Sequence, residues 1–393
     1  MTMDDNSFDV VVVGGGIIGS AAAFCLGRRG LTVALVERNQ IGSGTTDRSF
    51  AWINATSKVA DEAYHRLNAM GAALYRELAV EFSDACLGLY PSGMLQCVSR
   101  GDETGHKAML QQAERLSCYG YPICILGAKE LAAIEPRISF GEDAEALFAM
   151  ADGWLDAPHF ARFLASELRS MGSTVIENCT AKELRITDQG TITGVVTARG
   201  TLSTPKVLVT VGPDTPEVLS ELTGYDAFAA RFPMTRVPGL LVTTPRTSPS
   251  QLIRHILYFD GPSDSMHLRP AANGGLLLGA DDTDGMVAED PSPGQMREAA
   301  IRLLRRAKTL IPGFVGEGCI DDCELAVGLR PYPQDGKTLA GALPGTEGFY
   351  LIATHSGVTL APVLAKLMAE TIVDGLVPEP LQPFTLERFP GFV

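Results

Sequence analysis

The strongest constraint on the fold is the stretch DVVVVGGGIIGSAAAFCLGRRGLTVALVER, which occupies residues 9–38. Its unbroken valines at 10–13 predict a strand buried on both faces, because a half-exposed strand would alternate apolar and polar residues. A glycine-rich turn then opens a helix expected over Ile18–Arg29, which RRG closes with basic residues and a C-cap glycine. The run LTVALVE predicts a second strand ending on Glu37. Strand, helix and strand in this order indicate a βαβ unit of a parallel sheet.

The glycines of this unit form the pattern G-x-G-x-x-G. Gly14 permits the tight turn, Gly16 lets a pyrophosphate approach the backbone, and Gly19 allows close packing of the helix on the strand. The N–H groups of the helix N-terminus would bind the phosphates, and Glu37 would accept the two hydroxyls of a ribose. An acid at this point favours NAD or FAD over NADP. The residues of the unit expected to contact the dinucleotide are Gly14, Gly16, Ile17, Ile18, Gly19, Glu37 and Arg38.

Composition and charge exclude several other classes of protein. The 393 residues suffice for roughly two domains of 100–200 residues each. The net charge is −14 and no basic block exceeds two residues, so we expect no nucleic-acid partner. No apolar stretch reaches the ~18 residues of a membrane span and the start MTMDDNS is not signal-like, which predicts a cytoplasmic protein. The eight cysteines contain no CxxC pair, so neither a metal site nor a dithiol centre is expected.

The rest of the chain continues the α/β pattern. Residues 155–172 predict a helix capped by Asp156, and KVLVTVGP at 206–213 predicts another buried strand. Residues 348–375 predict a strand, a glycine-containing turn and a long helix. Residues 232–290 alternate strand-like runs with turn residues, which is typical of antiparallel sheet. No second strand–glycine–helix fingerprint follows, which disfavours enzymes that bind NAD(P)H beside a flavin.

Several further blocks carry a similarity along the whole chain: GSGTTDRSF, DGWLDAPHF, VLVTVGP, MHLRPAANGGLLLGADD, GLRPYPQDG and HSGVTLAP. With them the chain resembles the D-amino-acid oxidase, glycine oxidase and sarcosine oxidase family of FAD-dependent oxidoreductases. The resemblance implies an α/β fold, with a doubly wound, Rossmann-like FAD-binding domain of the glutathione-reductase type. An α+β substrate domain carrying an antiparallel sheet would be interleaved with it. The implied FAD-binding segments are 1–81, 156–218 and 322–393, and the implied substrate-binding segments are 82–155 and 219–321.

The resemblance also implies how FAD is held. The position at which sarcosine-oxidase relatives attach their flavin to a cysteine falls at Gly328, with Cys323 five residues upstream, so non-covalent FAD is expected. Beyond the N-terminal unit, the residues implied to contact FAD are Ser43, Gly44, Thr45, Thr46, Arg48, Ser49, Ala181, Val211, Gly212, Arg330, Ser356, Gly357, Val358 and Thr359.

Four residues are candidates for the substrate site. Arg330 matches the arginine that binds the substrate carboxylate in glycine oxidases, although an interdomain salt bridge would also place an arginine there. His267 falls where relatives often carry a tyrosine, and it could donate a hydrogen bond or titrate near neutrality. Arg269 shares its strand face by alternation, and either residue could instead be structural. His355 precedes the last helix, whose N–H groups are expected to face the flavin.

The segment Ala271–Met296 bears on the electron acceptor and on substrate charge. It contains no lysine or arginine, whereas sarcosine-oxidase relatives place a lysine over the flavin to activate oxygen. The acceptor could therefore be a quinone or an electron-transfer protein in place of O2. The segment also holds Asp281, Asp282 and Asp284. One of them facing the site would favour a cationic substrate group, but a solvated acidic turn is the expectation.

These observations predict an FAD-dependent oxidoreductase that oxidises the C–N bond of a small amino acid or secondary amine. The product would be an imine that hydrolyses to a keto acid or aldehyde. One alternative is the oxidation of a 2-hydroxy acid or similar alcohol, and another is a flavoprotein subunit of a larger oxidase complex. An oligomer is compatible with the sequence.

Overall fold

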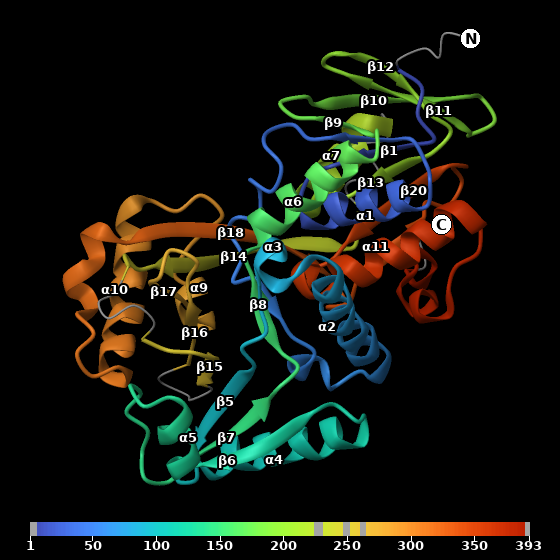
Figure 1. Ribbon diagram of the computed structural model, residues 1–393. Coiled ribbons are helices and arrows are strands. Elements are labelled where there is room, and N and C mark those ends of the chain that lie inside the picture. Colours follow the sequence, from blue (N-terminus) through green and yellow to red (C-terminus); the bar gives the residue numbers. More distant parts are fainter. Residues whose placement is uncertain (1–5, 224–230, 247–251, 260–264, 390–393) are drawn as a thin grey trace.

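The computed structural model describes residues 6–223, 231–246, 252–259 and 265–389. Two large sheets organise these residues (Figure 1). The first sheet contains the N-terminal βαβ unit, and helix α10 (Pro293–Leu310) packs on one face of the second. This mixed α/β arrangement is the predicted fold class.

The first sheet has six strands in the order β19-β20-β13-β1-β2-β9. Its neighbours pair in parallel except β19 and β20, which pair antiparallel. The predicted strand at 10–13 is confirmed, and the predicted helix begins and ends one residue earlier than expected, as α1 (Ile17–Arg28). The strands are β1 (Val10–Val13), β2 (Val33–Val36), β9 (Thr174–Ile176), β13 (Val207–Val209), β19 (Leu339–Ala342) and β20 (Phe349–Ala353).

Strand β1 is buried on both faces, as its valines predict. Val10 and Val12 belong to a core shared with helices α1, α2, α6 and α11, whereas Val11 and Val13 belong to a core on the opposite face. That second core is covered by helix α7 and a small antiparallel sheet (Figure 1). These covering elements are α2 (Glu62–Phe82), α6 (Ala157–Ser170), α7 (Thr215–Thr223), α11 (Gly357–Asp374), β10 (Ala181–Ile186), β11 (Ile192–Thr197) and β12 (Gly200–Ser203).

Local signals set the helix ends. The Asp156 carboxylate accepts a hydrogen bond from the His159 N–H at 3.1 Å, which caps α6 as predicted. Helix α11 ends at Gly375, whose φ of +73° is the left-handed conformation that glycine adopts readily.

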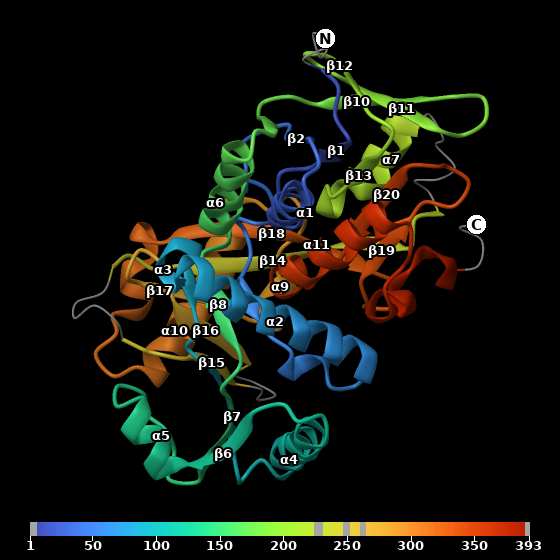
Figure 2. The same cartoon turned by 45° about the vertical axis from the view of Figure 1, so that its right-hand side comes forward.

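The second sheet has eight strands in the order β18-β14-β17-β16-β15-β5-β7-β6. Its pairs are antiparallel except β15 with β5, which run in parallel. Helix α10 (Pro293–Leu310) packs on one face and α4 (Glu103–Cys118) contributes to a core on the other (Figure 2). The strands are β5 (Met94–Ser99), β6 (Ile123–Gly127), β7 (Ala144–Ala149), β14 (Met234–Thr243), β15 (Ile256–Phe259), β16 (Met266–Pro270), β17 (Leu276–Gly279) and β18 (Glu324–Pro333).

Shorter elements connect the two sheets. Strands β3 (Trp52–Ile53), β8 (Gly153–Leu155) and β4 (Leu89–Tyr90) form a three-stranded sheet. Among the described residues, the remaining short helices are α3 (Asp84–Leu87), α5 (Ala128–Ile134) and α9 (Asp281–Asp284). The 3₁₀ turns are η1 (Thr56–Lys58), η2 (Gly212–Asp214), η3 (Gly316–Asp322), η4 (Glu379–Phe384) and η5 (Leu386–Arg388).

Strands β14 and β18 form a ribbon of ten consecutive residue pairs, from Met234 with Pro333 to Thr243 with Glu324. The ribbon runs through the centre of the molecule (Figure 1). By its hydrogen bonds β18 belongs to the second sheet, although the sequence-based boundary at residue 322 assigned it to the FAD-binding domain. The predicted domain boundaries otherwise remain a prediction.

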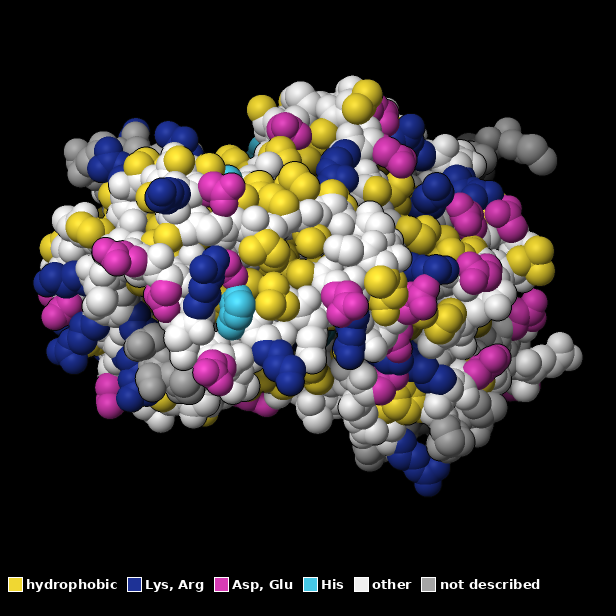
Figure 3. Space-filling model, turned by 90° about the horizontal axis from the view of Figure 1, so that it is seen from below, with side chains coloured by type: hydrophobic (Ala, Val, Ile, Leu, Met, Phe, Trp, Pro, Cys, Tyr) yellow, Lys and Arg dark blue, Asp and Glu magenta, His cyan; other side chains and the backbone are white. Residues whose placement is uncertain are grey.

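Figure 3 shows one face of the molecule, where basic and acidic side chains are intermixed and hydrophobic side chains gather near the middle. Among the described residues, no helix has the length and apolar character needed to cross a membrane.

Candidate active site

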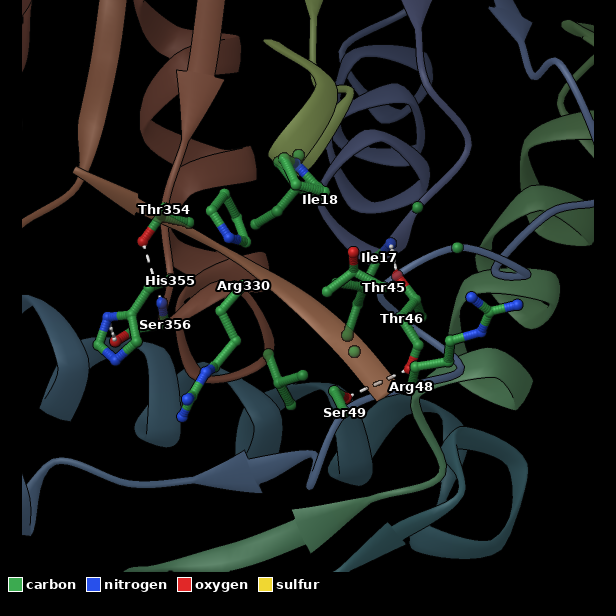
Figure 4. Close-up of a pocket in the computed structure, with 18 of the residues that line it drawn as sticks. Ile17, Ile18, Thr45, Thr46, Arg48, Ser49, Arg330, Thr354, His355 and Ser356 are labelled. Carbon is green, nitrogen blue, oxygen red and sulfur yellow. Dashed lines mark hydrogen bonds between the residues drawn. The ribbon is translucent and has the colours of Figure 1, made fainter. Parts of the chain in front are cut away.

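A cavity of about 820 Å³ extends from the N-terminus of α1 to the second sheet. Of the residues expected to contact FAD, all but Gly19 line it. Arg330, His267 and His355 line the same cavity, and Arg269 does not. Figure 4 shows Ile17 and Ile18 at one side of this space and the side chains of Arg330 and His355 projecting into it from β18 and from the segment before α11.

The first turn of α1 borders the cavity. The Ile17 N–H donates to Thr46 Oγ1 at 3.0 Å, so one of the helix's free donors is already taken by the chain itself (Figure 4). The Ser20 N–H makes the first backbone bond of the helix, to the Gly16 carbonyl at 2.9 Å. The N–H groups of Ile18 and Gly19 therefore remain at the positive end of the helix dipole, where a pyrophosphate binds best.

Gly19 lies behind this turn. A Cβ atom there would sit 1.8 Å from the Gly14 carbonyl oxygen and 2.5 Å from Thr210 Oγ1, distances that no side chain can occupy. Its place outside the cavity lining agrees with the packing role that the G-x-G-x-x-G pattern gives it.

The Glu37 carboxylate is fixed at the nucleotide end. One oxygen accepts the Gly15 N–H at 2.7 Å and the other accepts the Asn39 N–H at 2.8 Å. Each carboxylate oxygen can accept a second hydrogen bond, so both remain available to sugar hydroxyls.

The N-terminus of α11 provides a second set of donors. The first backbone bond of this helix runs from the Leu360 N–H to the Ser356 carbonyl at 3.0 Å. Thr359 Oγ1 donates to the Trp52 carbonyl and accepts from the Asn54 N–H, both at 3.0 Å, which fixes the helix end against β3. The N–H groups of Gly357, Val358 and Thr359 thus lie at a positive helix end that borders the cavity.

Arg330 both lines the cavity and forms the ion pair considered as its alternative role. Its Nη2 lies 2.8 Å from Asp284 Oδ2 and 3.2 Å from the Pro238 carbonyl oxygen. Within the described ranges, Nε is buried without an acceptor, and both hydrogen bonds come from Nη2. The guanidinium therefore retains donors for a ligand.

The acidic segment divides between two environments. Asp284 and Asp281 line the cavity, whereas Asp282 pairs with Arg306 at 2.6 Å on the outside. Burial raises the pKa of Asp284 to about 6, against the lowering effect of Arg330 and of the Leu240 N–H that it accepts. The expectation of a solvated acidic turn is therefore wrong for Asp284, whose side chain is 11% exposed.

The two cavity histidines are neutral at physiological pH. Burial lowers the pKa of His267 to about 4 and that of His355 to about 3; Lys58 and Arg330 add to the lowering at His355. The expectation that His267 titrates near neutrality is wrong, because the interior disfavours its charged form. A neutral imidazole can still donate one hydrogen bond and accept another.

Arg269 has a structural environment. Its Nε donates to the Phe50 carbonyl and its Nη1 to the Pro270 carbonyl, both at 2.7 Å. Its guanidinium carbon lies 4.2 Å from the centroid of the Trp154 ring, a stacked cation–π contact. These contacts hold the side chain away from the cavity, so the structure does not bring Arg269 to the candidate substrate site.

Gly328 is in van der Waals contact with the neighbouring backbone. A Cβ atom there would lie 1.9 Å from the Arg48 carbonyl oxygen, so a cysteine at this position would require the backbone to move. Cys323 lies 3.7 Å from Cys319, sulfur to sulfur, and does not line the cavity. The cysteine that lines it is Cys179, at the end of the cavity where the Cys179 N–H donates to the Glu37 carbonyl.

Several polar residues of the cavity were not predicted from the sequence, among them Lys58, Gln96, Gln112 and Tyr258. They come from η1, β5, α4 and β15, elements that carry no family motif. One signal was available for Lys58, which is the only lysine among the first 106 residues. Among the described residues, no group of three or more His, Cys, Asp or Glu side chains could hold a metal ion.

A buried carboxyl supports η1, and it leads to a first prediction. Asp152 is 1% exposed and accepts hydrogen bonds from Thr56 Oγ1 at 3.0 Å and Tyr121 Oη at 2.5 Å. Burial raises the pKa of Asp152 to about 7, whereas an unfolded aspartate titrates near 3.9. The folded state thus binds this proton more tightly, and the resulting stabilisation is complete below about pH 4 and lost as the pH rises through about 7.

We therefore expect Asp152→Asn, which keeps the shape of the protonated acid, to lose this pH dependence. The melting temperature of the variant relative to wild type should rise between pH 5 and pH 8. A difference that stays constant across this range would contradict the assignment of a proton to Asp152.

Comparison with known proteins decides the family. Residues 9–371 match the family described as DAO, FAD dependent oxidoreductase. The chain belongs to this family. It is 26% identical to the glycine oxidase of Geobacillus kaustophilus (strain HTA426) over 402 residues, which cover 98% of this chain and 98% of that protein.

Solved structures agree on the fold of this DAO-family chain. The crystal structure of glycine oxidase from Geobacillus kaustophilus has a TM-score of 0.79 at 25% identity, covering 98% of this chain and 99% of that one. L-proline dehydrogenase from P. horikoshii has a TM-score of 0.81 at 21% identity over 98% of each chain, which shows the fold alone. The predicted family, fold class and FAD dependence are confirmed.

The residues present fit FAD. Two helix N-termini with free N–H groups border one continuous cavity, and the fixed Glu37 carboxylate lies at the end nearest α1. The positive helix ends are complementary to the phosphates and to the flavin ring, which gains negative charge on reduction. The Glu37 carboxylate is complementary to the ribose hydroxyls.

Proposed function

We propose that this FAD-dependent oxidoreductase, which acts on the C–N bond of amino acids or amines, binds the carboxylate of a small amino-acid substrate through Arg330. The observation that carries the proposal is the Arg330 guanidinium, which lines the cavity and uses Nη2 alone for its bonds to Asp284 and Pro238. A carboxylate meets such a planar fork in two parallel hydrogen bonds, which fixes the α-carbon. Glycine oxidase, the relative named above, takes its name from an amino acid of this kind.

Neighbouring groups can prepare the amine. Oxidation requires the neutral amine, and the cavity offers the Asp284 carboxylate with neutral His267 and His355. Asp284, with its pKa raised to about 6, can hold a proton taken from the ammonium form. FAD, when bound, supplies the hydride acceptor, and the positive end of α11 would stabilise negative charge there. The imine product would then be hydrolysed by water.

We further propose that FAD is held without a covalent bond. The packing at Gly328 and the position of Cys179 at the far end of the cavity support this. Acid precipitation of the purified protein should leave the yellow colour in the supernatant. Colour that stays with the pellet would overturn this part of the proposal.

The electron acceptor is proposed to be O2 or a quinone or electron-transfer protein. The presence of Lys58 in the cavity removes part of the argument against O2 that rested on the lysine-free segment 271–296. Mixing the reduced enzyme with aerated buffer distinguishes O2 from the other acceptors, because only an oxidase is reoxidised by air as fast as it turns over. A cytoplasmic location and an oligomeric assembly are further parts of the proposal, to be tested by fractionation and size-exclusion chromatography.

An anaerobic substrate panel tests the proposed reaction directly. We expect glycine, a D-amino acid or an N-methyl amino acid to bleach the yellow flavin absorbance of the purified holoenzyme. Bleaching by 2-hydroxy acids alone would favour the alcohol-oxidising alternative. No bleaching until other subunits are added would favour a component of a larger oxidase complex.

A further inference from the structure

The cavity continues well beyond Arg330 across the second sheet. Its lining includes residues of β18, β14, β16, β15 and β5, and β5 lies five strand positions from β18. Neighbouring strands are about 4.8 Å apart, so the lining spans roughly 24 Å measured along the sheet. We call the end lined by Lys58, Met94, Gln96, Gln112 and Tyr258 the distal arm.

The distal arm is polar and lies between three elements. Lys58 ends η1, Gln96 is on β5 and Gln112 is on α4. Gln112 Nε2 donates to the Thr56 carbonyl at 3.0 Å, which ties α4 to η1. Gln96 is 8% exposed, so its amide is a buried polar group next to the cavity. An ammonium and amide N–H donors together form an environment suited to an anion.

Arg330 and Lys58 both line the cavity, but of the two only Arg330 is paired with a carboxylate in the described part of the chain. Arg330 is paired with Asp284 at 2.8 Å. Lys58, in contrast, has no carboxylate of the described residues within 4.0 Å of Nζ. The nearest acids in sequence pair elsewhere, Asp61 with Lys337 and Glu62 with Arg66. A half-buried cation without a partner is costly, and an anionic ligand would remove that cost.

The Lys58 side chain is mostly charged at neutral pH. Burial lowers the pKa of Lys58 to about 8, so most molecules carry the ammonium at pH 7. Its charge, together with burial, lowers the pKa of His355, which also lines the cavity.

We infer that the substrate carries a second anionic group, of the carboxylate class, which binds in the distal arm to Lys58 with help from Gln96 and Gln112. The substrate would thus be a dicarboxylic amino acid or an amino acid whose nitrogen bears a carboxyalkyl group. Arg330 holds the carboxylate beside the reacting carbon, and Lys58 selects substrates by the distant one. This inference rests on the proposed function of Arg330.

Binding of unreactive acids to the holoenzyme tests the inference without turnover. The probes are matched pairs of equal carbon number: butyrate with succinate, valerate with glutarate, and hexanoate with adipate. Calorimetry and the shift of the flavin spectrum give each dissociation constant. We expect wild type to prefer at least one dicarboxylate over its monocarboxylate partner by tenfold or more, the effect typical of a charge-assisted hydrogen bond.

Variants at two lysines identify the group responsible. Lys58→Met should abolish the preference by weakening dicarboxylate binding far more than monocarboxylate binding, and Lys58→Arg should keep part of it. Lys107→Met is the matched control, since Lys107 is exposed on α4 and does not line the cavity. No preference in wild type, or an equal loss for both members of each pair in Lys58→Met, would overturn the inference.

The two proposals fail in different ways. If amines and amino acids do not bleach the flavin, the proposed function is wrong whatever Lys58 does. If monocarboxylic amino acids bleach it and the dicarboxylate preference is absent, the proposed function stands and the role of Lys58 is wrong.

Discussion

Replacing Arg330 by alanine should raise the KM for the substrate well over tenfold. Losing a buried, charge-assisted hydrogen bond costs about 2–5 kcal/mol, and each 1.4 kcal/mol is a factor of ten in binding. Steady-state kinetics on the purified holoenzyme measures the effect. Unchanged kinetics would remove Arg330 from the substrate site.

The same substitution also disturbs the protein itself, and a second variant separates the two effects. Without the guanidinium, Asp284 loses the partner that lowers its pKa, so its pKa should rise above about 6 and the acid should take up a proton. Arg330→Ala should therefore lower the melting temperature most at alkaline pH, where a buried carboxylate is left uncompensated. Combining it with Asp284→Asn should restore much of this stability and leave the KM high. Recovery of the wild-type KM in the double variant would instead mean that the unpaired Asp284 carboxylate raises the KM of Arg330→Ala, and that Arg330 does not contact the substrate.

Replacing Gly19 by alanine should abolish FAD binding and destabilise the fold. The added Cβ would lie 1.8 Å from the Gly14 carbonyl oxygen, so the first turn of α1 must move away from β1. Overpacking of this kind costs about 1–3 kcal/mol and occasionally more, and the movement also displaces the N–H groups meant for the pyrophosphate. The ratio of flavin to protein absorbance and the melting temperature of the apoprotein report the two consequences.

Gly294→Ala is the matched control for this substitution. Gly294 lies in the first turn of α10, and a Cβ there would meet its nearest neighbour, Ser292 Oγ, at 3.9 Å, an ordinary contact. This variant should keep its FAD and its stability. Equal flavin content in Gly19→Ala and Gly294→Ala would contradict the packing role assigned to Gly19.

Local patterns were enough to predict the dinucleotide-binding unit. The valines of β1, the glycine spacing and the Asp156 cap each act within a few residues, and each lies where the sequence places it. The helix α1 begins one residue earlier than predicted, at Ile17, whose N–H donates to Thr46 Oγ1.

The substrate end of the cavity could not be predicted in this way, because long-range packing creates it. Arg330 and Asp284 are 46 residues apart and meet only through the β14–β18 ribbon and α9. Arg269 lies on the expected strand, but its guanidinium stacks on the ring of Trp154, which is distant in sequence. The histidine pKa values depend on burial, which no motif encodes.

The placement of β20 and α11 has a consequence for biosynthesis. Strand β20 joins the sheet through β13, and α11 packs in the same core as α1. Segments close to the C-terminus therefore complete the sheet and the core that the first forty residues begin. At about 5–20 residues per second, the ribosome delivers β20 roughly 20–70 s after β1. Until β20 and α11 are synthesised, the sheet that contains β1 is incomplete and one side of α1 lacks its packing partner. The nascent protein should accordingly depend on chaperones that shelter apolar segments, and premature termination before residue 349 should yield aggregates rather than a smaller folded protein.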